Sequence, residues 1–345
     1  MVQVESRELN APSLRASILV VSRTADLLNR LLRSLDEGYG GEAKAVEVLI
    51  SWNGSASEEE RIQGGRLPWR VVQRDPYHFA SNMNGLARQA RGAVLVFAND
   101  DLIADPASVE AAIERLETRP DVGIVGARLR TSSGQLAHAG IHFTSYGSPY
   151  HQLEGFVDAN HPVNEREQLV PAVTGAFFAM RRADFLQLEL AETFQACGED
   201  VLLCLQTRSQ LHKQVLFCPA MGGVHDAEST RRQSENQQGN ENDMQRLRSG
   251  WREWLQRADQ KSLQVELRAA QDEAEDLRGV CRELQNSTTA LNAVNQEIGK
   301  LQKIVAEQRS KNTKVAMEQT LLESENKRLR SRIQQLENEL ERIRL

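Results

Sequence analysis

After Arg257, this 345-residue chain contains no Trp, Tyr, Phe or Pro. Leu, Gln, Glu, Lys and Arg dominate there instead. This composition excludes an aromatic-rich globule and favours a long helix. We therefore expect a polar N-terminal tail over 1–15, a globular domain over 16–257 and a helical region over 258–345.

Cysteine is scarce, and long apolar runs are missing. The four cysteines are Cys197, Cys204, Cys218 and Cys281. Because they lack the paired CxxC spacing of a zinc site, we expect free, reduced thiols. Residues 1–15 lack the charged-then-apolar pattern of a signal segment, and runs such as 93–98 are too short to span a bilayer. The sequence therefore predicts a cytoplasmic protein.

An excess of basic residues is also missing. The formal net charge is −6, and residues 258–345 hold 15 basic and 15 acidic residues, so the net charge lies in the preceding region. An acidic domain repels a polyanion. Nucleic acid is therefore not expected as a partner, whereas a small phosphate ligand is compatible if a bound cation offsets the repulsion.

What the chain does have is a repeated alternation of strand and helix patterns. Strands are expected over 17–21, 46–50, 93–98 and 122–125, and helices over 80–91 and 106–117. This order predicts an α/β fold, with an open, mainly parallel sheet and flanking helices. Ligands of such sheets collect at the carboxyl ends of strands. That edge would carry Ser22, Asn53, Asp100 and Asp101.

Two adjacent carboxylates follow the expected strand 93–98. Like charges this close oppose each other's ionisation, and a divalent cation is the simplest remedy. Asp101 is the preferred ligand, with Asp100 and Asn99 oriented toward ribose, water or metal. Oxygen ligands suit Mg²⁺ or Mn²⁺. The alternative is that the three residues begin a loop and cap the helix after Pro106.

Two further candidates lie in the second half of the globular region. Glu199 and Asp200 precede a helical run, where acidic residues commonly cap a helix. In the functional interpretation, Asp200 is a general base that accepts the proton of a sugar hydroxyl. His225 follows the strand-like segment 215–218 and gains weight from the expected metal.

These residues belong to a series of motifs that resembles the family-two glycosyltransferases of the A-type fold. The similarity is greatest to bacterial enzymes that build O-antigen, capsule and other rhamnose-rich polysaccharides, and it covers about 16–257. The motifs are, in order, 79–85 (FASNMNG), 91–92, 99–101 (NDD), 122–126 (VGIVG), 135–140 (QLAHAG), 173–176 (VTGA), 199–200, His225 and 251–254 (WREW).

The resemblance implies an inverting transfer from a nucleotide-sugar donor to a glycan or lipid-linked oligosaccharide. Asp101 and His225 would hold Mn²⁺ or Mg²⁺, and Asp200 would be the base. A donor-binding half over 16–130 would use Ser22, Asn53, His78, Asn84 and Asp100. An acceptor-binding half over 131–257 would use His138, Thr174, Gly175 and Glu199.

Three positions depart from the family pattern. Trp52 stands where an Asp commonly binds the nucleobase, so base recognition is altered or relies on stacking. Leu202 and Gln206 replace an acidic residue and an Arg of the helix after Asp200. These departures motivate an alternative, a degenerate transferase that acts as a scaffold. A nucleotidyltransferase is disfavoured because residues 22–25 are not a Gly-rich phosphate loop.

The C-terminal region has the apolar spacing of a coiled coil. Steps of four and three residues run from Leu263, shift register near 286–289, and continue to the end of the chain. Leu dominates one core position, and Asn312 and Asn326 occupy the other. This pattern predicts a parallel homodimer, with a trimer as the alternative. The basic run 327–332 could touch anionic lipid at a membrane surface, or form a solvated helix face.

Overall fold

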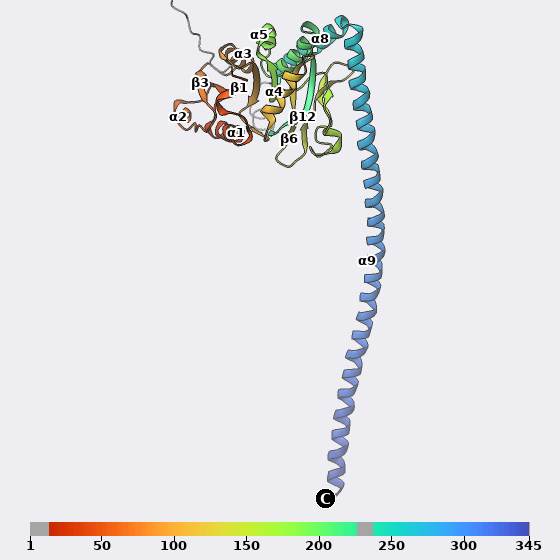
Figure 1. Ribbon diagram of the computed structural model, residues 1–345. Coiled ribbons are helices and arrows are strands. Elements are labelled where there is room, and N and C mark those ends of the chain that lie inside the picture. The colour runs from red at the N-terminus through yellow and green to blue at the C-terminus, as the bar shows by residue number, and fades with distance from the viewer. Residues whose placement is uncertain (1–13, 226–236, 345) are drawn as a thin grey trace, which may run out of the picture. The chain divides into compact units, whose positions relative to one another are not determined.

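The computed structural model describes residues 14–225 and 237–344 (Figure 1). Most of the expected tail over 1–15 and the residues just after His225 lie outside this range. The longer strands are β1 (Ala16–Ser22), β2 (Val46–Trp52), β3 (Trp69–Gln73), β4 (Val94–Asn99), β6 (Val122–Arg130), β11 (Phe177–Arg181) and β12 (Gln214–His225). The short strands are β5 (Leu102–Ala104), β7 (Leu136–His138), β8 (Ile141–Phe143), β9 (Pro149–His151) and β10 (Gln168–Leu169).

The helices alternate with these strands over the first half of the chain, as the sequence predicts. They are α1 (Ala25–Gly38), α2 (Ala56–Glu59), α3 (Phe79–Gln89), α4 (Ser108–Thr118), α5 (Arg182–Leu188), α6 (Glu199–Gln210), α8 (Gln237–Arg257) and α9 (Gln260–Arg344). Two 3₁₀ turns cover Ala43–Ala45 and Pro162–Asn164. The α/β prediction is therefore confirmed.

The main sheet has the strand order β10-β12-β6-β11-β4-β1-β2-β3, with β5 added to β12 and β7 added to β6. β3, β2, β1 and β4 pair in parallel, as do β6 and β12. β11 lies between β4 and β6 and runs against both. The carboxyl ends of β1, β2, β4 and β6 consequently share one edge of the sheet.

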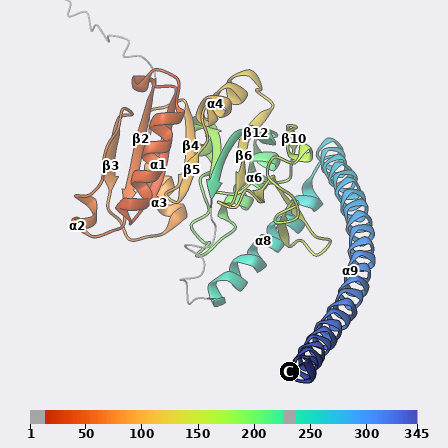
Figure 2. The ribbon, with the colours of Figure 1, turned by 90° about the horizontal axis from the view of Figure 1, so that it is seen from below.

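Helices cover both faces of this sheet (Figure 2). On one face, Ile18 and Val20 of β1 share a buried core with apolar residues of α1 and α4. On the other, Phe97 of β4 stacks on Phe178 of β11 and contacts Phe185 of α5. Both faces are thus apolar, as expected of a buried parallel sheet, and polar groups gather at the strand ends.

The compact part of the structure runs to Leu277, and residues 278–345 form a second unit. The division falls after the boundary expected near Arg257, because the first turns of α9 pack on the globular region. There, Arg208 pairs with Glu266 at 2.7 Å, and Arg166 pairs with Asp276 at 2.6 Å. The described helices include none that is long and apolar enough to cross a membrane.

Candidate active site

The carboxyl end of β1 carries the first polar contact of the site. Ser22 Oγ donates a hydrogen bond to Asp100 Oδ2 at 2.7 Å, which joins the end of β1 to the residue after β4. Asn53 follows β2, and its N–H donates to the carbonyl of Ser22 at 2.8 Å. The parallel register of β1, β2 and β4 therefore brings Ser22, Asn53 and Asp100 together on one edge.

Asp101 and His225 meet although 123 intervening residues separate them in the sequence. β5 begins immediately after Asp101 and pairs antiparallel with β12, and this pairing places His225 opposite Leu102. As a result, His225 Nε2 lies 3.1 Å from Asp101 Oδ1, with both side chains largely buried. Asn99 Nδ2 lies 3.4 Å from the same His225 nitrogen. The structure thus brings a carboxylate and an imidazole to the end of β4.

This corner of the sheet concentrates negative charge. Burial raises the pKa of Asp100 to about 6, and the neighbouring Asp101 adds to the rise, while Ser22 and Arg23 oppose it. The pKa of Tyr77 is also raised, first by desolvation and then by Glu199 and Asp100. Carboxylates from both halves of the domain therefore raise the pKa of Tyr77. Neither Tyr77 nor Arg23 belongs to a motif, so sequence reasoning missed them.

Asp200 reaches the same edge through β11. Because β11 runs against β4, the residues before β11 lie beside those after β4, and the N–H of Asn99 donates to the carbonyl of Ala176 at 2.9 Å. One residue earlier, the Gly175 N–H donates to Asp200 Oδ2. Asp200 Oδ1 accepts from the N–H of Val201 at 2.7 Å. The Asp200 carboxylate is therefore held between the start of α6 and the start of β11.

His138 lies beneath Thr174 and Gly175. It is 1% exposed, and its pKa is well below the usual value, first because of burial and then because of His151 and His225. The neutral ring accepts from the Thr174 N–H through Nε2 at 3.4 Å, and its Nδ1 lies 3.1 Å from His151 Nδ1. A neutral imidazole that accepts through Nε2 carries its proton on Nδ1. His138 thus supports the turn that contacts Asp200.

Two predicted donor residues, Asn84 and His78, make hydrogen bonds to other parts of the fold. Asn84 is 1% exposed, and its side chain bonds both the N–H and the carbonyl of Leu190 at 2.9 Å. Its amide therefore anchors the loop after α5. His78 caps α3 by accepting from the Ser81 N–H through Nδ1 at 3.2 Å. Glu199, by contrast, lies in the first turn of α6, and its negative charge raises the pKa of Tyr77.

A hollow of about 430 Å³ opens beside Asn53. Its lining includes Trp52 and Asn53 at the end of β2, Glu59 of α2, and Arg74 and Asp75 after β3. The buried Asn53 Oδ1 has no hydrogen-bond partner among the described residues. The volume of the hollow suits a ligand of nucleoside size.

Trp52, one of the residues that line this hollow, also makes contacts within the turn after β2. Its ring is 2% exposed, and its Nε1 donates to the carbonyl of Ser55 at 3.2 Å. A Cβ on Gly54 would lie 2.6 Å from the same ring. Trp52 therefore packs against the turn after β2 and also lines the hollow.

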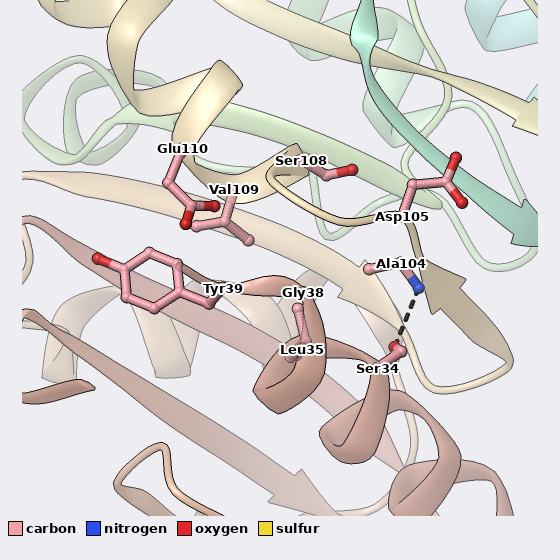
Figure 3. A pocket seen from close by; sticks show the side chains of 9 residues that line it. All are labelled: Ser34, Leu35, Gly38, Tyr39, Ala104, Asp105, Ser108, Val109 and Glu110. Atoms are coloured by element: carbon pink, nitrogen blue, oxygen red, sulfur yellow. Dashed lines mark hydrogen bonds between the residues drawn. The ribbon is translucent and has the colours of Figure 1, made fainter. Parts of the chain in front are cut away.

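A second cavity lies between α1 and α4 (Figure 3). Its volume is about 10 Å³, which is room for about one water molecule. Ser34 Oγ accepts from the Ala104 N–H there at 3.0 Å. Too small for a substrate, this cavity belongs to the packing of α1 on β5.

Asp101 and His225 fit a divalent cation that takes only part of its ligands from the protein and the rest from a substrate and water. Among the described residues, no cluster of three or more His, Cys, Asp or Glu side chains could enclose a metal. Asp101 and His225 supply one carboxylate and one imidazole instead. Mg²⁺ commonly takes one or two protein carboxylates and completes its shell with phosphate and water oxygens. This donor set therefore suits a metal–diphosphate complex better than a closed metal site.

Residues 17–188 match the family described as Glycosyl transferase family 2. The chain contains a family-two glycosyltransferase domain. The resemblance noted in the sequence is thereby confirmed. The domain match includes the ends of β1, β2 and β4 and stops before Asp200 and His225.

Two curated relatives are similar to parts of this chain. The O-antigen biosynthesis protein RfbC of Myxococcus xanthus is 31% identical over 218 residues, which cover 59% of this chain and 17% of that protein. The uncharacterized protein y4gI of Sinorhizobium fredii (strain NBRC 101917 / NGR234) is 28% identical over 132 residues, covering 36% and 14%. The chain thus spans less than a fifth of the length of either relative.

Solved glycosyltransferase structures are more distant. The mannosyltransferase PcManGT from Pyrobaculum calidifontis, in complex with GDP-Man and Mn²⁺, has 14% identity and a TM-score of 0.48, over 80% of each chain. GalNAc-T7 with UDP, GalNAc and Mn²⁺ has 14% identity and a TM-score of 0.48, over 64% of this chain and 45% of that one.

Proposed function

We propose that this chain is a metal-dependent, inverting glycosyltransferase. It moves a sugar from a nucleotide-sugar donor to a hydroxyl of a lipid-linked glycan in bacterial surface-polysaccharide synthesis. The observation that carries the proposal is the 3.1 Å contact between Asp101 and His225 at the sheet edge of a family-two domain. The partial similarity to an O-antigen biosynthesis protein supports the pathway.

Asp101 and His225 would hold the cation. When bound, a divalent cation neutralises negative charge on the diphosphate leaving group. The acidic pair at residues 100–101 favours such a ligand, because burial and mutual repulsion already raise the pKa of Asp100. The nucleoside would enter the hollow beside Asn53, between the ends of β2 and β3.

Asp200 would act as the general base. Its carboxylate, held by the N–H groups of Gly175 and Val201, accepts the proton of the acceptor hydroxyl while that oxygen bonds to the anomeric carbon. The bond from that carbon to the diphosphate breaks on the opposite face, which inverts the configuration. Thr174 and Glu199 lie next to these contacts and would face the sugar or acceptor.

Calorimetric titration of the full chain with UDP, GDP and dTDP tests this function. We expect one of the three to bind with Mn²⁺ and to lose at least about tenfold in affinity when EDTA replaces the metal. Asp101→Asn should abolish the metal effect, whereas Asp121→Asn, at an exposed pair with Arg119, should keep it. If none of the nucleotides binds, the enzymatic proposal fails and the scaffold interpretation is favoured.

We propose further that the second unit forms a parallel homodimeric coiled coil. α9 is helical throughout, and large apolar side chains at its heptad core positions are exposed in a single chain, including Leu301 (53%), Leu322 (59%) and Leu329 (57%). Leaving such a stripe in water is unfavourable, and a second copy would cover it in register.

Sedimentation equilibrium tests the dimer. The full chain should have twice its mass of 38.7 kDa. The double variant Leu322→Asp/Leu329→Asp should be a monomer, and Ser324→Asp, on the outer face of the same turn, should remain a dimer. A monomeric wild type would exclude the coiled coil, and a trimer would overturn only the stoichiometry.

A further inference from the structure

Asp243 of α8 is a buried carboxylate that gathers the backbone of the loop before α6. Its side chain is 0% exposed. Asp243 Oδ2 accepts hydrogen bonds from the N–H groups of Gln195, Ala196 and Cys197 at 2.8, 2.7 and 3.3 Å. Its Oδ1 accepts from Arg246 at 3.0 Å. Four donors on one buried carboxylate make a strong, directional anchor.

The loop that Asp243 holds leads directly into the helix that carries Asp200. Gly198 caps α6 in the left-handed region, with φ of 105°, so the chain turns sharply there. A Cβ at Gly198 would lie 3.0 Å from Phe194 and 3.4 Å from Leu247. Leu247, one helical turn after Asp243, is also fully buried. One face of α8 therefore fixes both the backbone and the packing of this turn.

Asp200 depends on the turn for its position. Its carboxylate spans from Val201 in the first turn of α6 to Gly175 at the start of β11. A shift of the turn would therefore move the carboxylate relative to Gly175. Misplacement of a reacting group by about 1 Å can lower a rate about 100-fold. We propose that Asp243 is a positioning residue that aims Asp200 at the acceptor hydroxyl; this inference rests on the proposed function.

The test compares Asp243→Ala and Asp243→Asn with Glu47→Gln in the full chain. Glu47 is a matched control, because it is a buried carboxylate with several donors at the opposite end of the sheet. The assay is Mn²⁺-dependent hydrolysis of GDP-mannose, UDP-N-acetylglucosamine and dTDP-rhamnose, in which water takes the place of the acceptor. Thermal denaturation of each variant measures the structural effect separately.

We expect Asp243→Ala to lower kcat about 50-fold, with a donor KM within about twofold of wild type. Asp243→Asn should recover part of that loss, because its amide oxygen still accepts from the loop N–H groups although it no longer pairs with Arg246. Glu47→Gln should lower the Tm and leave kcat within about twofold. A purely structural role for Asp243 would instead make its variants behave like Glu47→Gln.

If Asp243→Ala does not fold, the test rests on Asp243→Asn, which should show a lowered kcat and an unchanged donor KM. Wild-type kcat in Asp243→Asn, or a loss no larger than that of Glu47→Gln at equal Tm, overturns the inference. Failure of the proposed function has a different signature, since Asp200→Asn would then turn over donor as fast as wild type.

Discussion

The parallel strands β1, β2 and β4 bury carboxylates at both of their ends, with opposite electrostatic results. At the amino end, Glu47 is 3% exposed and accepts hydrogen bonds from Ser17 and from the backbone and guanidinium of Arg91. Burial by itself raises the pKa of Glu47, but these donors outweigh it and hold the pKa below its usual value. At the carboxyl end, burial and Asp101 raise the pKa of Asp100 to about 6, despite the hydrogen bond from Ser22.

The difference separates a structural cluster from a ligand site. The amino end supplies its own cation, so its buried charge is balanced without a ligand. The carboxyl end holds two carboxylates whose charge the protein offsets less completely, although Arg23 lowers the pKa of Asp100 in part. A site of this kind is less stable alone and gains most from a bound cation. The variants below therefore affect activity at one end and stability at the other.

The largest expected effect is on turnover at the carboxyl end. Asp200→Asn keeps the size of the side chain but cannot accept the acceptor proton, so donor hydrolysis should fall about 10²- to 10⁴-fold. Nucleotide affinity should stay within about threefold, because the nucleotide binds elsewhere on the edge. Steady-state kinetics and calorimetry measure the two quantities, and full retention of turnover removes Asp200 from the mechanism.

At the amino end, removal of the carboxylate should affect stability instead. Glu47→Ala leaves the buried Ser17 hydroxyl without its acceptor and removes the hydrogen bonds from Arg91, so the free energy of unfolding should fall by about 2 kcal/mol. Nucleotide affinity at a temperature where the variant is folded should equal that of wild type. Urea denaturation gives the first value, and a stability loss below that of the exposed Asp121→Asn variant would contradict the comparison.

Asp100→Asn should change the free energy of unfolding in the opposite direction and stabilise the metal-free protein. The amide removes a charge that folding disfavours and still accepts from Ser22, so the metal-free protein should gain about 1–2 kcal/mol of unfolding free energy. Donor affinity in Mn²⁺ should fall in the same variant. Thermal denaturation with EDTA measures the gain, and a destabilised variant would mean that the carboxyl end is balanced like the amino end.

The smallest expected effect concerns His142, a buried histidine of β8 that lies outside the two ends compared above. Burial lowers the pKa of His142, next to Glu273 of α9, from 6.5 to about 4. Between these values the unfolded chain binds a proton that the folded chain does not, so stability falls as the pH falls. Glu273, whose pKa burial raises, offsets part of this loss at the acidic end.

The expected loss is roughly 1–2 kcal/mol between pH 6.5 and 5. Urea denaturation across this range measures it, and His142→Gln should flatten the profile without changing donor turnover at pH 7.5. His138, which is buried and has a lowered pKa, should leave a remaining slope. An unchanged slope in His142→Gln would show that the proton is taken up elsewhere.

The strands and their order along the chain could be predicted because each is a short apolar run followed by polar residues. The candidate edge followed from the same pattern, since parallel strands align their carboxyl ends. The pairing of β5 with β12 has no local signal, however. His225 therefore could be proposed from the family resemblance, and the structure supplies the geometric reason for its contact with Asp101.

Side-chain partners distant in sequence were the part that could not be predicted. Asn84 lies within a family motif, but its amide bonds Leu190, which comes after α5. Asp243 is one polar residue among many in α8, and its three backbone partners come from a loop without any repeat pattern. The burial of Trp52 likewise depends on tertiary packing, which the sequence around it does not reveal.

We propose that Asp101 and His225 together bind the metal of a metal–nucleotide complex. Electron spin echo envelope modulation of Mn²⁺ bound with the preferred nucleoside diphosphate tests it most directly, because it detects a coordinated imidazole nitrogen. We expect a nitrogen coupling in wild type and in His161→Gln that is lost in His225→Gln. The same coupling in wild type and His225→Gln would contradict it.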